Sequence, residues 1–545
     1  MAHAKATLIQ TLLILVLHNV NNANGVDPLV ETDAGLIKGL AATDGNYSMF
    51  LGIPYAKVNL ENPFGSAAPY PLFNETFEAY DDSVRCPQFD ESNNIGIGTL
   101  DCLNLNIYVP DSANSENPLP VMVFIHGGSF ATGTGGNRGA KFLVRHNVVF
   151  VTLNYRLGIY GFMCLGTAEV PGNEGLKDQL LGLRWVNKNI RQFGGDPDNV
   201  TLFGVSAGAR SVDFHLMAND ENLFSKAILQ SGNSISSPSI ATINTELPII
   251  LAEKHGFETN DFRQAVSFLT TVDPRLLVCT AFTVVGPTFQ ACVERENNGV
   301  DAYVPDFTIN RKIPKVKTTP ILTGFTSNEK YFSHFDKNNT KYKNFFGDFL
   351  NIYFTLDDNE LNSLEKLVRT FYIGGEEISE KVKQELADFD SDFTYIHPIQ
   401  RGIAQYISNG ASKIYYYMFS YVGERNRFSY SKNLTASGAV HADDAAYLFN
   451  LPKFSETPSP ADQLTIDRMT TMWTNFAKYG DPTPEKSNIL PVKWEPLAAS
   501  NWYYYSIDSE LSLKRQPFNR RMSFLDLLFK MNHNLQKGLQ KKTCY

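Results

Sequence analysis

The sequence has no internal repeat, no low-complexity tract and no linker rich in proline, glycine and serine. We therefore expect one large domain instead of a string of modules, although 545 residues would be enough for several domains. Basic residues form no cluster outside the short C-terminal tail and the net charge is −9, so nucleic acid is not an expected partner. Apolar residues make up 43% of the chain and charged residues 19%, the balance of a globular protein with a large core.

Long apolar runs are also missing, apart from Leu8–Leu17 near the start of the chain. This run follows Lys5, is too short to span a bilayer comfortably, and precedes small and polar residues at 21–25. We expect residues 1–25 to be a cleaved secretory signal peptide, with an uncleaved anchor as the alternative, and residues 26–545 to be one domain with a short tail. No later segment predicts a transmembrane helix, and the last residues match no ER-retention or GPI signal. These features predict a secreted, extracellular protein without a membrane anchor.

Cysteine is scarce, with six residues, and in an exported protein most of them are expected to pair. Cys86 lies close to Cys102 in the sequence, and Cys279 lies close to Cys292. Each pair would close a loop of about 15 residues and stabilise the fold by roughly 3 kcal/mol, although spacing alone leaves the connectivity open. Cys164 lies in an apolar stretch, so we expect a buried free thiol there.

If the protein is exported, its terminal cysteine could form a disulfide between chains and its Asn-x-Ser/Thr sequons could be glycosylated. Cys544, next to the last residue, could link two chains or remain an unpaired or capped thiol, so a monomer and a homodimer are both open. Five Asn-x-Ser/Thr sequons occur, and the one at Asn199 directly precedes an apolar strand and is not expected to carry sugar. The four expected glycosylation sites are Asn46, Asn74, Asn338 and Asn433.

Short apolar runs rich in β-branched residues alternate with helical patterns along the chain. Continuous apolar runs favour parallel strands that are covered on both faces. Between two of them, residues 178–193 place Leu183, Val186 and Ile190 at helical spacing. This order predicts an α/β fold, with a central, mostly parallel, twisted sheet, helices on both faces, and sites at the carboxyl ends of strands. The expected strands are residues 121–125, 148–153, 200–203, 227–230, 320–325 and 413–419.

A G-x-S-x-G motif at Gly204–Gly208 (GVSAG) directly follows one expected strand and precedes a helical pattern. A sharp turn from strand to helix lifts a serine hydroxyl to the edge of the sheet, and the glycines leave room for the crowded backbone. The helix N-terminus adds N–H groups that stabilise developing negative charge. The motif alone also fits an ordinary turn, but in this context it predicts Ser206 as the nucleophile of an acyl-transfer enzyme.

A second glycine-rich turn, His126–Phe130 (HGGSF), follows another expected strand. Such a turn can aim backbone N–H groups at an oxyanion, and losing one such donor typically lowers the rate by about 100- to 1,000-fold. Considered alone, this segment would be interpreted as an ordinary glycine turn without a catalytic role. Together with the serine motif, it predicts an oxyanion hole formed by the N–H groups of Gly128, Ser129 and Ala207. His126 precedes the serine in the chain and is expected to be structural.

The acid and the base are expected downstream, because with this serine motif the triad runs in the order serine, acid, histidine. His441 lies in a glycine-containing loop, Gly438–Asp444 (GAVHADD), after an expected strand, and the other downstream histidines lack such a setting. Glu329 also follows an expected strand and would hold the imidazole in the productive tautomer. Many other carboxylates lie between Ser206 and His441, so the pattern leaves Glu329 as one of several candidates.

Several further motifs extend over nearly all of the chain after the expected signal peptide. They are Phe50–Ala56 (FLGIPYA), Asp101–Asn106 (DCLNLN), Asn154–Gly158 (NYRLG), Gly172–Gln179 (GNEGLKDQ), Phe193–Pro197 (FGGDP) and Trp473–Pro482 (WTNFAKYGDP). Together they resemble the type-B carboxylesterase/cholinesterase family, and most closely its secreted insect carboxylesterases. The resemblance implies the α/β-hydrolase fold, a deep gorge leading to the serine, a triad of Ser206, Glu329 and His441, and the disulfides Cys86–Cys102 and Cys279–Cys292.

Several positions depart from the pattern of the family that the sequence resembles, among them Pro63 and Leu100, which stand where the family commonly pairs an Arg with a Glu. Val205 stands where the family usually has Glu or Gln, and the absence of the Gln found in juvenile-hormone esterases disfavours that substrate. Ser129 replaces the third glycine of the oxyanion turn and adds a Cβ atom that could tighten it. Lys330 stands where a glycine usually follows the catalytic acid. Val205 therefore bears on the substrate, Ser129 on the oxyanion hole, and the joint replacement at Pro63 and Leu100 is interpreted as a coordinated structural change.

Tryptophan is scarce: there are four, and none lies in the loop 87–101, where cholinesterases use one to hold a quaternary ammonium group. We therefore expect a neutral, fairly apolar ester as the small-molecule substrate, cleaved through an acyl-enzyme without metal or organic cofactor. A histidine base predicts that activity falls as the pH drops through roughly 6–7. The alternatives are a non-catalytic cholinesterase-like adhesion or ligand-binding protein, disfavoured by the intact triad, and a lipase for long-chain glycerides.

Overall fold

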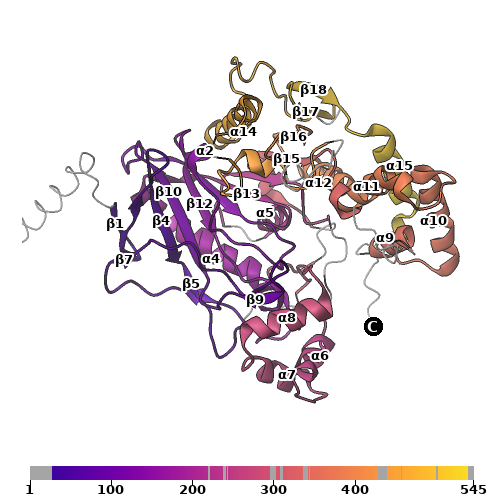
Figure 1. The fold of residues 1–545 in the computed structure, drawn as a ribbon, viewed down its shortest axis with the longest axis horizontal. Coiled ribbons are helices and arrows are strands. Elements are labelled where there is room, and N and C mark those ends of the chain that lie inside the picture. The colour runs from indigo at the N-terminus through magenta and orange to yellow at the C-terminus, as the bar shows by residue number, and fades with distance from the viewer. Residues whose placement is uncertain are drawn as a thin grey trace, which may run out of the picture.

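The computed structural model describes residues 28–218, 221–236, 241, 243–294, 302–306, 311–334, 342, 344–426, 438–455, 457–498 and 501–537. Within these residues, the central sheet has eleven strands, and seven neighbouring strands run parallel (Figure 1). In spatial order the parallel strands are β17 (Tyr503–Ile507), β16 (Ile414–Phe419), β15 (Ile321–Thr326), β14 (Lys226–Gln230), β13 (Gly195–Val205), β11 (Leu119–Ile125) and β12 (Val149–Leu153).

Antiparallel strands complete both edges of this sheet. All six strands expected from the sequence are present within a few residues of their expected bounds, whereas the outer strands were not predicted. The sequence of one outer strand, NLNIYVP, shows why, because its two asparagines break the apolar run. The outer strands are β18 (Ser512–Arg515) beside β17, and β10 (Asn104–Pro110), β4 (Tyr47–Pro54) and β3 (Leu40–Ala41) beyond β12.

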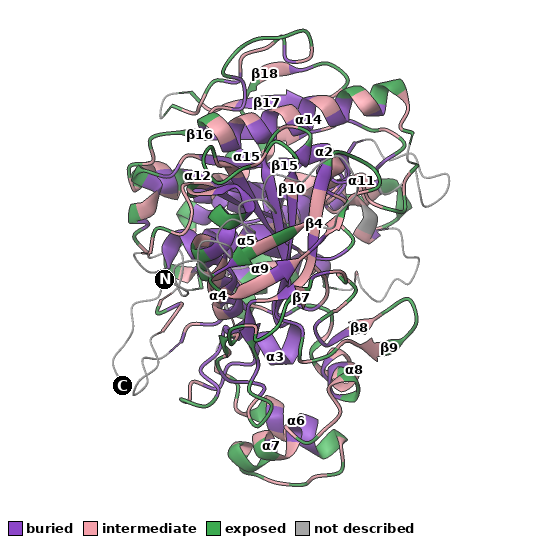
Figure 2. Cartoon of the chain, turned by 90° about the vertical axis from the view of Figure 1, so that its left-hand side faces the viewer, coloured by how far each residue is buried: buried purple, intermediate pink, exposed green. Residues whose placement is uncertain are grey.

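Successive residues of the parallel strands point to opposite faces and form two cores. In β11, Val121 and Val123 belong to one core, whereas Met122 and Phe124 belong to the other. Helices cover both faces, as the continuous apolar runs predicted, and Figure 2 shows the buried strands at the centre with exposed residues on the outer helices. The first core includes residues of α4 (Glu174–Asn189), α5 (Ala207–Met217) and α12 (His397–Ser408), and the second includes residues of α2 (Lys141–Val144) and α14 (Pro460–Tyr479).

Apart from the short α3 (Gly158–Phe162), which packs in the first core, the remaining α-helices of the described residues lie at two ends of the molecule (Figure 1). One group is α6 (Glu246–Lys254), α7 (Phe262–Leu269) and α8 (Pro274–Val285), and the other is α9 (Phe345–Tyr353), α10 (Asp358–Ile373), α11 (Lys383–Ser391) and α15 (Asn519–Met531). A π-helical turn, η7 (Asp392–Ile396), joins α11 to α12. None of the helices in the described ranges combines the length and apolarity that crossing a bilayer requires.

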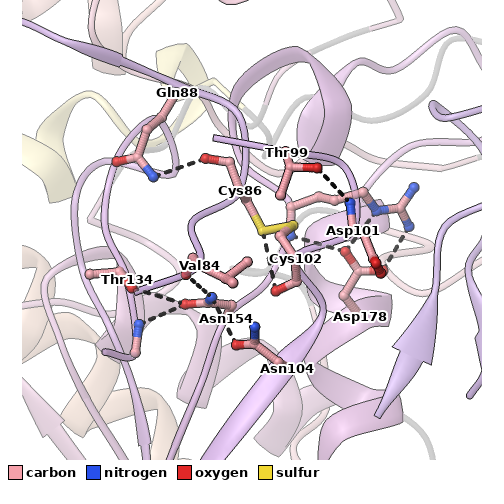
Figure 3. Close-up of a disulfide and its surroundings, with 12 residues drawn as sticks. Val84, Cys86, Gln88, Thr99, Asp101, Cys102, Asn104, Thr134, Asn154 and Asp178 are labelled. Atoms are coloured by element: carbon pink, nitrogen blue, oxygen red, sulfur yellow. Dashed lines mark hydrogen bonds and ion pairs between the residues drawn. A yellow bond between two sulfur atoms is a disulfide. The ribbon is translucent and has the colours of Figure 1, made fainter. Parts of the chain in front are cut away.

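The expected disulfide Cys86–Cys102 is present, with the two Cα atoms 5.0 Å apart. It ties the segment before β8 (Gln88–Asp90) to the start of β10. Figure 3 shows how side chains secure this junction: the Gln88 amide donates to the carbonyl of Cys86 at 3.0 Å, and the Asn154 amide donates to the carbonyl of Val84 at 2.9 Å. The disulfide therefore anchors a loop next to the oxyanion turn, since Gln88 also hydrogen-bonds Gly133.

The expected pairing of Cys279 with Cys292 is wrong, and so is the free thiol expected at Cys164. The structure joins Cys164 to Cys292, with Cα atoms 6.5 Å apart, and leaves Cys279 as a free cysteine on α8. The side chain of Asn173 accepts from the amide of Cys292 and donates to its carbonyl, both at 2.8 Å, which holds Cys292 against the loop after Cys164. Spacing of 13 residues suggested the nearer cysteine, but tertiary packing selected the one 128 residues away.

This connectivity predicts the result of peptide mapping. Alkylation of the unreduced protein should label Cys279, and digestion without reduction should yield one peptide pair that contains Cys164 and Cys292. Closing a loop of more than 100 residues is worth about 4–5 kcal/mol in the chain-entropy model, so the double variant lacking this bridge should unfold at lower urea than the native protein. A crosslinked peptide containing both Cys279 and Cys292 would contradict the structure.

A buried histidine on α5 gives the fold a dependence on pH. In His215, Nε2 lies 2.9 Å from Oε1 of Gln179, and Nδ1 faces the hydroxyl of Tyr303. Burial, together with the charge of Lys315, lowers the pKa of His215 to about 3. An exposed histidine in the unfolded chain has a pKa of about 6.5, so between these values the unfolded state binds more protons than the folded state. The free energy of unfolding must therefore fall as the pH drops through this window.

We expect His215 to account for a loss of about 2 kcal/mol in unfolding free energy between pH 6.5 and pH 5. Glutamine at this position does not titrate, so His215→Gln should lose about 2 kcal/mol less than the native protein over the same range. Urea denaturation of both proteins at the two pH values measures the difference, and any constant cost of the substitution cancels. Equal acid-induced losses would show that His215 is not the group responsible.

Candidate active site

Ser206 occupies the sharp turn between β13 and α5 that its motif predicted. Its backbone has φ 60° and ψ −122°, an unfavourable conformation for a residue with a side chain, and it is the N-cap of α5. The turn is fixed from two directions, because the Ser206 amide donates to the carbonyl of Gln230 at 2.8 Å and the Ser206 carbonyl accepts from the amide of Arg210 at 3.0 Å. Such imposed strain is typical of functional positions.

The glycines around Ser206 are required by close backbone contacts. A Cβ atom on Gly204 would lie 2.4 Å from the carbonyl carbon of Gly208, and one on Gly208 would lie 2.0 Å from the carbonyl oxygen of Ile125. A Cβ atom on Gly127 would lie 3.0 Å from the Cβ atom of Ser206. The serine turn and the turn after β11 are therefore packed directly against each other.

The predicted oxyanion turn is an unusual run of left-handed residues. Gly128 has φ 120°, and Ser129 and Phe130 both have φ 56°. The carbonyl of Gly128 accepts from the amide of Ala131 at 2.9 Å, and the carbonyl of Ser129 accepts from the amide of Phe289 at 3.0 Å. Within the described part of the chain, the N–H groups of Gly128, Ser129 and Ala207 have no protein acceptor. The turn thus leaves unpaired donors next to the serine.

His126 supports this turn as a neutral side chain. Its ring stacks on Tyr155 with the centroids 4.4 Å apart, and the Tyr155 hydroxyl donates to the His126 carbonyl at 2.9 Å. Burial lowers the pKa of His126 to about 3, so the imidazole stays uncharged at neutral pH. This geometry agrees with the structural role expected from the sequence.

Glu329 and His441 lie together at the same edge of the sheet. Nδ1 of His441 is 2.6 Å from Oε2 of Glu329, and the His441 amide donates to the Glu329 carbonyl at 3.1 Å. The other carboxylate oxygen accepts from the amide of Thr326 at 2.8 Å, and the Glu329 side chain is fully buried. A carboxylate at Nδ1 keeps the proton on that nitrogen and leaves Nε2 with a free lone pair.

Nε2 of His441 faces the hydroxyl of Tyr395 at 3.5 Å. The structure shows a hydrogen bond between the predicted acid, Glu329, and the predicted base, His441. In the described residues the Ser206 hydroxyl makes no hydrogen bond, and none is formed between Ser206 and His441. Tyr395, whose ring packs on His441, has its pKa raised by burial, and the positive charge of Arg210, one turn after Ser206, partly opposes this rise.

The comparison with known families identifies the class of protein to which the chain belongs. The model of the carboxylesterase family matches residues 26–525. The chain belongs to the carboxylesterase family. It is therefore a serine hydrolase with the α/β-hydrolase fold, as the sequence motifs indicated.

Curated relatives of this carboxylesterase include enzymes from mammals and insects. The chain is 32% identical over 533 residues to a bile salt-activated lipase of Homo sapiens, covering 91% of this chain and 68% of that protein. It is 30% identical over 537 residues to a juvenile hormone esterase of Heliothis virescens, covering 91% and 93%. It is also 30% identical over 481 residues to esterase FE4 of Myzus persicae, covering 82% and 83%.

A solved structure extends the likeness to three dimensions. Juvenile hormone esterase from Manduca sexta, with OTFP covalently attached, superposes with a TM-score of 0.81 at 27% identity and covers 93% of this chain and 100% of that one. The carboxylesterase fold therefore spans nearly the whole of this chain.

Several polar residues around the site of this carboxylesterase were not singled out by the sequence. Asp444 is buried behind His441 and accepts from Gln230 at 2.9 Å and from the Tyr417 hydroxyl at 2.7 Å. Burial raises the pKa of Asp444, and the charge of the nearby Glu329 raises it further. Tyr395, which touches His441, comes from the π-helical turn and has no recognisable motif around it. The described residues contain no cluster of side chains fit to hold a metal ion.

The predicted modification sites are only partly covered by the structure. Asn46 and Asn74 are exposed, and Asn199 is half-buried with its side chain accepting from Lys226. Asn338, Asn433, Cys544 and residues 1–25 lie outside the described residues.

Proposed function

We propose that this carboxylesterase hydrolyses a neutral, fairly apolar carboxylic ester with Ser206 as nucleophile, His441 as base and Glu329 as supporting acid. The observation that carries the proposal is the 2.6 Å contact between Glu329 and His441 at the sheet edge where Ser206 is held in a strained turn. Among the described residues, His441 with Glu329 is the histidine–acid pair that follows a parallel strand, β15, in the same sheet as the strand that leads to Ser206.

The reaction follows from these positions. Nε2 of His441 takes the proton of Ser206 as the hydroxyl oxygen attacks the ester carbonyl, and the amides of Gly128, Ser129 and Ala207 receive the oxyanion. The C–O bond to the alcohol then breaks, and the alcohol leaves with the proton held by His441. Water repeats the attack on the acyl-enzyme and releases the carboxylic acid. Buried Glu329 stabilises the imidazolium in both stages.

The surroundings favour a neutral or apolar substrate over a cationic one. A small hollow beside the oxyanion turn is lined mostly by apolar side chains, among them Phe89, Phe282 and Phe289. Lys330 and Arg210 add positive charge near His441, with Asp390 paired to Lys330. A quaternary ammonium ester would meet no tryptophan in the loop 87–101 to hold its charge.

We extend the proposal to export and surface modification. The two disulfides suit an oxidising compartment, which supports a secreted enzyme. Asn46 and Asn74 are exposed and accessible to glycosylation, and Asn338 and Asn433 remain predictions from their sequons. A monomer and a homodimer linked through Cys544 both remain open. The non-catalytic alternative, an adhesion or ligand-binding protein, would retain the fold without turnover.

A panel of p-nitrophenyl and glyceride esters of increasing chain length tests the proposal. We expect saturable hydrolysis of soluble neutral esters by the full chain and much slower hydrolysis of a choline ester. Activity that begins only above the concentration at which micelles form would favour a lipase. No turnover of any ester by the folded protein would favour the non-catalytic alternative and refute the proposal.

The oxyanion turn gives a further prediction, because Ser129 has φ 56°. Glycine adopts this backbone conformation without steric cost, whereas residues with a side chain are strained in it. Ser129→Gly should raise the free energy of unfolding by about 1 kcal/mol. It keeps the backbone N–H group and the carbonyl bonded to Phe289, so kcat/KM should change by less than about threefold. Urea denaturation and ester hydrolysis measure the two effects.

The matched control is Gly128→Ala in the same turn. Its Cβ atom would lie 1.9 Å from the carbonyl oxygen of Thr132, at φ 120°. The turn must shift, so we expect kcat/KM to fall by about 100-fold or more. If Ser129→Gly were as damaging as Gly128→Ala, the side chain of Ser129 would have a role that the proposed oxyanion hole does not include.

A further inference from the structure

Tyr395 lies on a segment whose backbone is unusual. The π-helical turn Asp392–Ile396 interrupts the α-helical path between α11 and α12. Such turns are rare and occur frequently at functional sites, because the extra residue bulges out of the helix. Side chains from other elements hold the bulge in place: the Tyr372 hydroxyl donates to Asp392 at 2.8 Å, and the Tyr353 hydroxyl donates to the carbonyl of Phe393.

The bulge places Tyr395 directly against His441. The two ring centroids are 4.6 Å apart with 31° between the planes, and the phenol oxygen lies 3.5 Å from Nε2. Tyr395 is 8% exposed, and burial raises its pKa, so its hydroxyl stays protonated and can donate. In the described residues this is the single hydrogen bond of that hydroxyl.

The contact complements the one made by Glu329. A hydrogen bond at Nδ1 fixes one point of the imidazole but leaves the ring free to rock about that bond. A phenol packed on the ring face limits this freedom, and its hydroxyl lies 3.5 Å from Nε2, close enough to donate weakly to the lone pair of that nitrogen. That lone pair is the one that must accept the proton of Ser206 in the proposed reaction.

Lys330 holds the tyrosine from the same chain segment that supplies the acid. Its ammonium group lies 5.7 Å from the centroid of the Tyr395 ring and 3.8 Å from Asp390, whose charge raises the pKa of Lys330. Asp390 also accepts from Thr394 at 2.9 Å, next to Tyr395. Adjacent residues 329 and 330 thus contact the histidine and the tyrosine that packs on it.

We propose that Tyr395 is a positioning residue for ester hydrolysis, whose ring fixes the orientation of the His441 imidazole and whose hydroxyl caps Nε2 until substrate engages Ser206. The role rests on the proposed function of His441 as base. It agrees with the contacts of the described residues, in which the hydroxyl near Nε2 is that of Tyr395 and the Ser206 hydroxyl makes no hydrogen bond.

Two substitutions separate the ring from the hydroxyl. Tyr395→Phe keeps the stacking and should lower kcat by less than about threefold, while the acid limb of kcat/KM moves up by about half a pH unit, since a hydrogen bond to neutral imidazole is lost. Tyr395→Leu also removes the stacking and should lower kcat by about 10- to 100-fold with KM changed less than about threefold. The other ionisable groups acting on this site are Glu329, Lys330, Arg210, Asp390 and Asp444, which both variants retain.

The matched control is Tyr353→Phe, which deletes a hydroxyl that also bonds the π-helical turn but does not contact His441. It should shift the melting temperature without moving the pH profile. Every variant is compared at a temperature well below its own melting transition, so that loss of folded protein is not read as loss of kcat.

A second readout does not depend on turnover. Acylation of the His441 imidazole by diethyl pyrocarbonate, followed by peptide mass spectrometry, should be about fivefold or more faster in folded Tyr395→Leu than in the native protein, because Nε2 is uncapped. If the native protein showed no ester hydrolysis but this difference persisted, the proposed function would fail while the positioning contact stood. Unchanged kcat, pH profile and acylation rate in folded Tyr395→Leu would overturn the inference.

Discussion

Replacing Ser206 with alanine should lower kcat for a soluble ester by at least about 10,000-fold and up to about a million-fold. The expected loss is large because the serine oxygen forms the acyl-enzyme, and the remaining amides of Gly128, Ser129 and Ala207 can then only assist direct attack by water. The variant should fold, since alanine makes the same backbone hydrogen bonds to Gln230 and Arg210. Initial rates at saturating ester, with circular dichroism as the check on folding, measure the effect.

The chain offers a close control in Ser231, a fully buried serine that also has a positive φ, 53°. It follows β14, beside the strand that leads to Ser206, and its hydroxyl has no hydrogen-bond partner in the described residues. Ser231→Ala should leave kcat within about threefold of the native value, because no step of the proposed reaction uses it. If both alanine variants lost activity equally, the loss would reflect a disturbed sheet edge and not a missing nucleophile.

Replacing Glu329 with glutamine should lower kcat by about 10,000-fold. The glutamine carbonyl oxygen would stay with the amide of Thr326, so its NH₂ group would face Nδ1 of His441. Nδ1 must then accept instead of donate, which moves the imidazole proton to Nε2. A protonated Nε2 cannot take the proton of Ser206, although the shape of the site is unchanged. Single-turnover kinetics with the native and variant enzymes measure the loss in the acylation step.

Asp444→Asn tests whether the acid has been assigned to the right carboxyl group. Asp444 is buried near His441, but its hydrogen bonds go to Gln230 and Tyr417 and not to the imidazole. We expect less than a tenfold loss of kcat. A larger loss in Asp444→Asn than in Glu329→Gln would mean that the supporting acid is Asp444.

The fold could be predicted from the sequence because it depends on local patterns. The six apolar runs gave six of the seven parallel strands, since strands buried on both faces carry their signal in consecutive residues. The serine turn was predictable for the same reason, as the contacts that require glycine at Gly204 and Gly208 lie within a few residues or on the neighbouring strand. Strand β10, with its asparagines, did not carry that signal.

Features that depend on tertiary packing could not be predicted from the sequence. Spacing alone left Glu329 as one of many carboxylates between Ser206 and His441; the family resemblance implied it, and the fold shows that it is 2.6 Å from the imidazole. The disulfide of Cys292 joins a residue far away in the chain, because Asn173 and the loop around it bring Cys164 close. Tyr395 lies in a segment of ordinary helical composition, where a π-helical turn has no sequence signature.

The central claim is that Ser206 is activated as a nucleophile by His441 and Glu329. Reaction with a fluorophosphonate probe, followed by mass spectrometry of the labelled peptide, tests it most directly, because the probe modifies a serine only where a base and oxyanion donors act on it. The account predicts that the native protein carries one adduct on Ser206, that Ser206→Ala carries none, and that Glu329→Gln reacts far more slowly. A folded native protein that takes up no probe, or that carries the adduct on another residue, would contradict it.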